Sequence, residues 1–171
     1  MLPYQLSKWS TSAKNFKSMA SGNRRQGREL ALKIIYSFPN QPGEIDQVLS
    51  GFWRNFNFNN DVLGDAVDEP AENLPPEVRA FSEQIARGTH AALERIDECI
   101  ERHSANWSLE RMSRVDLAIL RLGSYELLKH PDTPASVAIN EAIEIGKRYG
   151  TKETPAFVNG ILDKIAKSER S

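Results

Sequence analysis

The sequence predicts an all-α protein, a compact helical bundle of about six or seven helices. Apolar residues recur at spacings of three and four through most of the 171 residues, which is the period of an amphipathic helix. Proline and glycine fall between these periodic segments, where they end one helix or open the next. No segment alternates apolar and polar residues as a half-buried strand would.

The N-terminal half begins with a leader and one strong helix. Residues 1–22 are rich in serine, hold no acid and lack the apolar core of a secretory signal, so we expect a disordered basic leader. A helix is expected to begin after Asn23 as its N-cap and to end before Pro39. The single all-helical domain is expected to span residues 23–168.

The middle of the chain predicts a weaker helix, a loop and a long helix. The weaker helix is expected over residues 44–56. Residues 57–76 are acidic and hold several prolines, and we expect a mobile loop there. The apolar stripe then continues unbroken, which predicts one helix over residues 77–103.

Three further helices are expected after a short turn near Trp107. Ser113 is the expected N-cap of a helix over residues 114–129 that is apolar on nearly all sides and must therefore be surrounded by others. The last two helices each follow a Thr-Pro pair, which predicts Thr133 and Thr154 as their N-caps.

Charge is distributed unevenly, although the formal net charge is only -1. Residues 1–28 carry six bases and no acid, residues 44–78 carry eight acids and one base, and the remainder from residue 79 is balanced. Cations at a helix start oppose the helix dipole, so arginines there favour an external anion such as phosphate. The alternative is a solvated basic tail beside a solubilising acidic loop. The arginines concerned are Arg24, Arg25 and Arg28.

The sequence offers no positive case for an enzyme, a metal site or a cofactor. The three histidines lie far apart and the single cysteine, Cys99, is expected to be a small core residue. Asn140, Glu141 and Asn159 stand among apolar residues and are expected to bond neighbouring helix ends. No apolar run approaches the length of a membrane span.

Three segments carry a resemblance to a known family. RRQGRELALKIIYSF, AINEAIEI and FVNGILDK resemble the bacterial transcription antitermination factor NusB family, over roughly Arg24 to Lys167. The leader and the acidic loop go beyond the compact family pattern, and Gln26 stands where some relatives have another arginine. The resemblance implies a cytoplasmic, all-helical protein that binds boxA RNA together with the ribosomal protein NusE, within the RNA polymerase antitermination complex.

Carried over by position, the resemblance implies two sets of site residues. Contacts with NusE match Tyr36 and Asp116. The basic residue Lys152 lies near the start of the last helix, whose free N–H groups favour phosphate. Together with the residues implied by the resemblance, the expected RNA contacts are Arg24, Arg25, Arg28, Lys152, Glu153 and Phe157.

Other functions and assemblies stay open at this point. A similar domain precedes the catalytic part of some ribosomal RNA methyltransferases, so the chain could be an accessory domain. It could also be a helical partner-binding module without RNA contact. Homodimerisation, which occurs in some relatives, would hide the RNA face.

Overall fold

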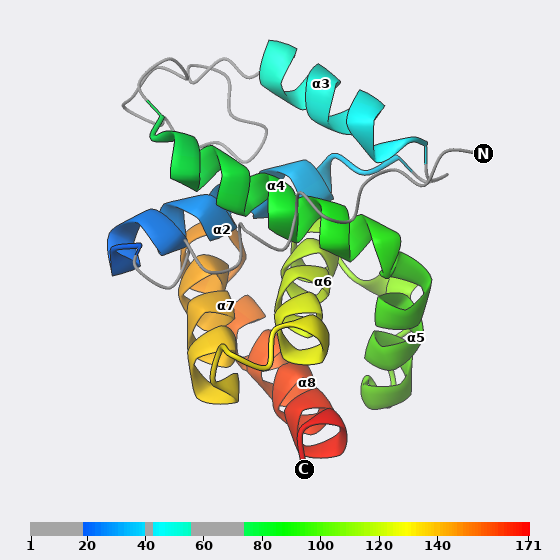
Figure 1. Cartoon of the computed structure of the whole chain (residues 1–171). Helices are drawn as coiled ribbons and strands as arrows, with labels where there is room; N and C mark the ends of the chain where they lie inside the picture. The colour runs from blue at the N-terminus through cyan, green and yellow to red at the C-terminus, as the bar shows by residue number, and fades with distance from the viewer. Residues whose placement is uncertain (1–18, 40–42, 56–73) are drawn as a thin grey trace, which may run out of the picture.

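The protein is a bundle of seven α-helices and one short 3₁₀ helix in the described part of the chain (Figure 1). The structure, a computed structural model, describes residues 19–39, 43–55 and 74–171. Most of the expected acidic loop and most of the expected leader lie outside these residues, while Pro76, the last residue of that loop, is the first residue of α4. The elements are α2 (Ser21–Tyr36), α3 (Ile45–Asn55), α4 (Pro76–Ala91), α5 (Leu93–His103), η3 (Leu109–Arg111), α6 (Arg114–Lys129), α7 (Ala135–Tyr149) and α8 (Thr154–Glu169).

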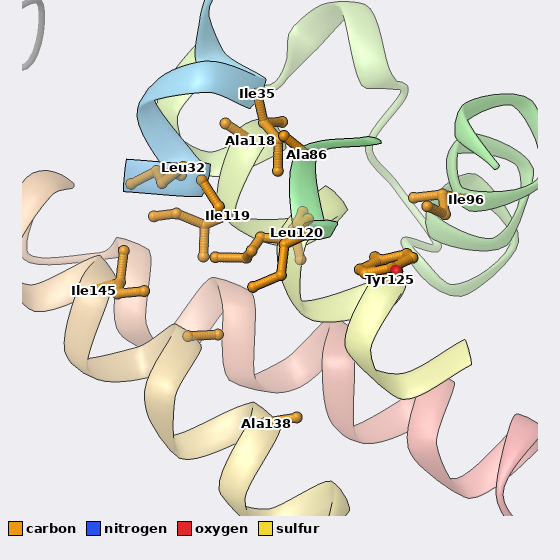
Figure 2. Packing of buried hydrophobic residues seen from close by; sticks show 14 of the residues in the cluster. Leu32, Ile35, Ala86, Ile96, Ala118, Ile119, Leu120, Tyr125, Ala138 and Ile145 are labelled. Atoms are coloured by element: carbon orange, nitrogen blue, oxygen red, sulfur yellow. The ribbon is translucent and has the colours of Figure 1, made fainter. Parts of the chain in front are cut away.

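Helix α6 forms the centre of the bundle, as its nearly uniform apolar surface predicts. It packs against α2, α4, α5, α7 and α8, and Figure 1 shows it between α7 and α5. Ile119 and Leu120 of α6 are fully buried and meet Leu32 of α2 and Ile145 of α7 in the core (Figure 2). Each buried aliphatic side chain of this kind contributes roughly 1.5–3 kcal/mol to folding.

Helix α2 begins earlier than the sequence predicts. Its N-cap is Ala20, so Asn23 lies within the first turn and the last two residues of the expected leader are helical. Met19, just before the helix, is buried in the hydrophobic core. Contact with the core therefore sets this helix start, and no side chain caps it.

The long helix expected over residues 77–103 is two helices, so that prediction was wrong. The backbone leaves the helical region at Ala92, with φ of −107° and ψ of 16°, and the chain turns from α4 into α5 (Figure 1). Helix α4 packs on α2 and α6, whereas α5 packs on α6 and α8. One straight helix cannot follow both paths, and no proline or glycine marks the break in the sequence.

One of the four expected N-caps, Ser113, is confirmed. The Ser113 hydroxyl accepts a hydrogen bond of 3.1 Å from the main-chain N–H of Asp116, as a cap of α6 should. The N-caps of α7 and α8 are Pro134 and Glu153, one residue away from the two threonines that the sequence predicts, and neither makes a side-chain cap. The α8 prediction was wrong because the Thr154 hydroxyl is bonded elsewhere, as described below.

Two glycines allow helices to approach closely. A Cβ atom on Gly88 would lie 2.1 Å from the hydroxyl oxygen of Tyr125, and one on Gly123 would lie 2.6 Å from Leu162. Because atoms cannot approach so closely, any larger residue would push α4 away from α6 or α6 away from α8.

Arg170, near the C-terminal end of the chain, forms hydrogen bonds to the C-terminal end of α6. The Arg170 guanidinium donates to the carbonyls of Glu126, Leu127 and His130, which belong to the last turn of α6 and its C-cap, and to that of Thr133. The Glu126 carbonyl also accepts a hydrogen bond from the main-chain N–H of His130. The last carbonyls of a helix lack main-chain partners within it, so Arg170 supplies donors to this helix end. No helix among the described residues is long and apolar enough to cross a membrane.

Candidate functional site

Arg25 lies on the surface at the start of α2 and is held by a carboxylate of α7. Its Nε and Nη2 atoms each donate a hydrogen bond of 2.9 Å to Glu141, and 48% of the arginine side chain stays exposed. The bond to Arg25 lowers the pKa of Glu141, and the same bond raises the pKa of Arg25. The pair therefore fixes the direction of an exposed, permanently charged guanidinium.

Arg28 occupies a different environment from the one that the sequence suggests. Its side chain is 6% exposed and forms an ion pair of 2.8 Å with Glu126 of α6, which is 4% exposed. The guanidinium also lies 5.7 Å from the centre of the Phe81 ring. This guanidinium already has a buried counter-ion within the bundle, so the phosphate contact expected for Arg28 stays a prediction.

Arg24 faces a pocket between α2 and α7. The pocket has a volume of about 300 Å³, and its walls also include Arg28, Glu141 and His130. Burial lowers the pKa of His130, so this ring favours its neutral form. Arg24 and Arg25 are thus the two arginines of the helix start that lie near the surface.

The start of α8 presents charged and aromatic side chains. Lys152 is 91% exposed and Glu153 is 69% exposed, and their charged groups lie 3.9 Å apart. Phe157 is half-buried at the edge of the core, so part of its ring faces outward. These three residues, all expected RNA contacts, lie together at the start of α8, just after the C-terminal end of α7.

A second aromatic side chain, Trp107, stands beside Phe157. The two ring centres lie 5.8 Å apart at an interplanar angle of 73°, and Trp107 is 46% exposed. The guanidinium of Arg111 lies 5.3 Å from the indole centre. From the sequence, Trp107 is expected only as part of a turn, although a tryptophan within the mostly polar run Ser-Ala-Asn-Trp-Ser is a signal that could have marked it.

Helix α7 connects the two charged regions. Glu141 holds Arg25, and about two turns further on Arg148 forms an ion pair of 3.0 Å with Glu29 of α2. From Glu141 to the end of α7 at Gly150 the helix rises roughly 13 Å. Arg25 and the start of α8 are therefore neighbouring parts of one side of the bundle.

Tyr36 lies at the end of α2, against the first turn of α6. Its ring lies 4.5 Å from the Arg114 guanidinium, and its carbonyl accepts a 2.8 Å hydrogen bond from the same group. Beside it is a pocket of about 620 Å³, whose walls include Asp97 and Arg121. These two residues pair at 2.8 Å, so the pocket has a polar wall with fixed geometry.

Asp116 lies two residues after Arg114 and turns toward α8. Its Oδ1 atom accepts a hydrogen bond of 2.7 Å from the hydroxyl of Thr154, which is 1% exposed. The same hydroxyl accepts a bond of 3.0 Å from the main-chain N–H of Thr151.

The remaining chemically reactive groups do not assemble into a metal site within the described residues. No group of three or more His, Cys, Asp or Glu side chains there could hold a metal ion. Cys99 is buried, as expected, and burial raises the pKa of its thiol, which disfavours the nucleophilic thiolate.

Comparison with known proteins identifies relatives along most of the chain. Residues 25–167 match the NusB family model. The transcription antitermination protein NusB of Syntrophotalea carbinolica is 59% identical over 152 residues, which cover 89% of this chain and 97% of that protein. NusB of Myxococcus xanthus is 39% identical over 145 residues, covering 85% and 95%.

Solved structures share the same helical arrangement. T. maritima NusB superposes with a TM-score of 0.68 at 36% identity, covering 86% of this chain and 93% of that one. A chain from a crystal structure of antitermination factors NusB and NusE in complex with dsRNA gives a TM-score of 0.64 at 20% identity, covering 87% and 99%, and this likeness concerns the fold. With the family model spanning most of the sequence and close relatives matching nearly end to end, the chain belongs to the NusB family.

Proposed function

We propose that this protein is a transcription antitermination factor that binds boxA RNA together with NusE. The observation that carries the proposal is the placement of exposed Arg25 and the exposed start of α8 on one side of the bundle, joined by α7. Single-stranded RNA offers phosphates and unstacked base faces, so a reader needs cations and an aromatic ring on one surface. The relatives named as transcription antitermination proteins support the same function.

Each residue of this surface has a distinct proposed role. Arg24, Arg25 and Lys152 contact phosphates, because all three are cationic and lie at or near the surface. Phe157 stacks on a base, and Glu153 accepts a hydrogen bond from a base edge. Arg28 supports the surface from inside by fixing α2 to α6 through Glu126.

The partner surface is proposed around Tyr36 and Asp116. Tyr36, at the end of α2, contacts Arg114 of the first turn of α6. Asp116 belongs to that same turn and accepts a hydrogen bond from Thr154. A solved relative that contains NusB, NusE and dsRNA supports NusE as the partner.

We extend the proposal to a role within the RNA polymerase antitermination complex, and hence to a cytoplasmic location. A homodimer that covers the RNA surface is a further proposal, and sedimentation with and without RNA tests it.

A titration of labelled boxA RNA, followed by fluorescence anisotropy with and without NusE, tests the function. Three phosphate contacts predict that log K falls with log salt at a slope of about −2, since each contact with a single strand contributes about −0.7. Arg25→Ala should reduce that slope by about 0.7 and weaken all RNA sequences alike. An affinity for boxA RNA that does not depend on salt contradicts the proposal. Binding of NusE without any RNA binding would instead support the partner-binding module.

A further inference from the structure

Trp107 is a large apolar side chain that lies exposed on the surface of the bundle. Only Trp107 and Val137 are large apolar residues with substantial exposure among those that the structure describes. A single exposed apolar residue is ordinary in a soluble protein. The surroundings of Trp107 are what make it informative, because they hold the indole in place without covering it.

The main chain at Trp107 is fixed on both sides by Ser104. The Trp107 N–H donates a hydrogen bond of 2.8 Å to the Ser104 carbonyl, and the Ser104 hydroxyl donates one of 2.9 Å to the Trp107 carbonyl. Ser104 is itself buried. The indole therefore projects from a closed turn whose position is set by the end of α5.

The indole ring is oriented by its two side-chain neighbours. Phe157 meets it in an edge-to-face arrangement, and Arg111 lies over the ring. An aromatic ring that is held in this way loses little conformational entropy when a ligand stacks on it. Arg111 is exposed, so its guanidinium adds positive charge beside the indole.

We propose that Trp107, with Arg111, forms a second base-stacking site for single-stranded RNA, next to Phe157. The inference rests on the proposed function and extends its surface from the start of α8 to the turn that precedes η3. A nucleotide base stacks on the indole or on the guanidinium above it, and the adjoining phosphate meets the positive charge of Arg111. An unpaired base fits this surface because it combines a flat apolar face with an adjoining negative charge.

Trp107 fluorescence reports this contact directly. A variant with Trp9→Phe and Trp53→Phe leaves Trp107 as the sole tryptophan, and single-stranded boxA RNA should quench its emission as a base stacks. A matched variant with Trp9→Phe and Trp107→Phe leaves Trp53, which also lies against an arginine, 4.5 Å from Arg79, but sits on α3. RNA should leave the emission of Trp53 unchanged. An abasic strand of the same length should quench neither.

Affinity provides the second readout. Trp107→Ala should weaken RNA binding roughly 5- to 150-fold, the range expected for loss of one base–aromatic contact, whereas Trp107→Phe should stay within a few-fold of the unmodified protein. Thermal unfolding of each variant shows whether it still folds. If Trp107→Ala does not fold, the fluorescence result decides whether the stacking site exists.

Three outcomes overturn the inference, and they are distinguishable from one another. If RNA binds with full affinity and Arg25→Ala weakens it, but Trp107 emission does not change, the stacking site is wrong while the proposed function stands. If boxA RNA does not bind at any salt concentration, both fail. Quenching by NusE in the absence of RNA, without quenching by RNA, would assign Trp107 to the partner and also overturn the inference.

Discussion

The hydroxyl of Thr154 donates a hydrogen bond of 2.7 Å to the carboxylate of Asp116, across 38 residues of sequence. Thr154 opens α8 and Asp116 lies in the first turn of α6. The bond therefore joins the helix start that carries the proposed RNA contacts to the helix start that carries the proposed partner contacts.

Loss of this bond should destabilise the protein. Thr154→Val removes the buried donor to Asp116 and the acceptor of the Thr151 N–H, so the free energy of unfolding should fall by about 1.5–3 kcal/mol. Urea denaturation measures the difference. Thr151→Val is a matched control, because the variant keeps the main-chain N–H that bonds Thr154 and removes only a long 3.5 Å contact between the two hydroxyls, so it should lose much less stability. Equal stability of the two variants would show that the bond contributes little.

Replacement of Arg28 should act on stability rather than on RNA contact. Arg28→Met leaves the Glu126 carboxylate buried without its partner, and the expected loss is about 3–5 kcal/mol. The double variant with Arg28→Met and Glu126→Met should recover most of it, since neither charge then remains buried. Chemical denaturation of the three proteins checks this. If Arg28→Met keeps full stability but loses RNA binding, Arg28 is a phosphate contact after all.

Removal of the Glu141 charge should strengthen RNA binding. Glu141→Gln takes away a carboxylate that bonds the Nε and Nη2 atoms of Arg25, so the guanidinium can offer those donors to a phosphate. We expect affinity to rise about 2- to 5-fold at low salt, with the gain shrinking as salt increases. Anisotropy titration measures it. Weaker binding would mean that Glu141 holds Arg25 in the orientation that RNA requires.

The charge of His130 should make stability depend on pH. Burial lowers its pKa from 6.5, so below about pH 6.5 the unfolded chain binds more protons than the folded one. The free energy of unfolding should therefore fall as pH decreases from about 6.5 toward the lowered pKa, and then level off. Denaturation between pH 5 and pH 8 measures this dependence.

His130→Gln provides the comparison for that pH dependence. The variant removes the titrating group, along with the 3.0 Å contact between the ring and the Tyr125 hydroxyl. Its stability should be lower at neutral pH and flatter across the same range. An identical pH profile in the two proteins would assign the dependence to other groups.

Much of the fold could be predicted from the sequence, because apolar periodicity determines which helices form. The all-α class, the central position of α6 and the cap at Ser113 were all predictable. The break at Ala92 was not, because the apolar stripe continues through it and only packing against different helices bends the chain. The same holds for Thr154, where bonding to Asp116 displaces the expected cap.

The candidate site was partly predictable for a similar reason. Residue type and spacing indicate which arginines cluster at a helix start, but not which of them turn inward. Arg28 meets Glu126, which is 98 positions away, and no local pattern signals that pair. Asn140 and Asn159, which are expected to bond helix ends among core residues, are exposed instead. Glu141, which follows Asn140 directly, forms the ion pair with Arg25. When apolar residues flank a polar one, the sequence does not show whether its side chain points into the core or toward solvent.

The four carbonyls that Arg170 satisfies also set an order for the chain as it leaves the ribosome. Helix α6 can form as soon as residues 114–129 emerge, but the carbonyls of its last turn have no donor from Arg170 until residue 170 has cleared the exit tunnel. During that interval the helix end depends on water. Nascent chains stalled before residue 170 should therefore show faster amide exchange in the last turn of α6 than released ones.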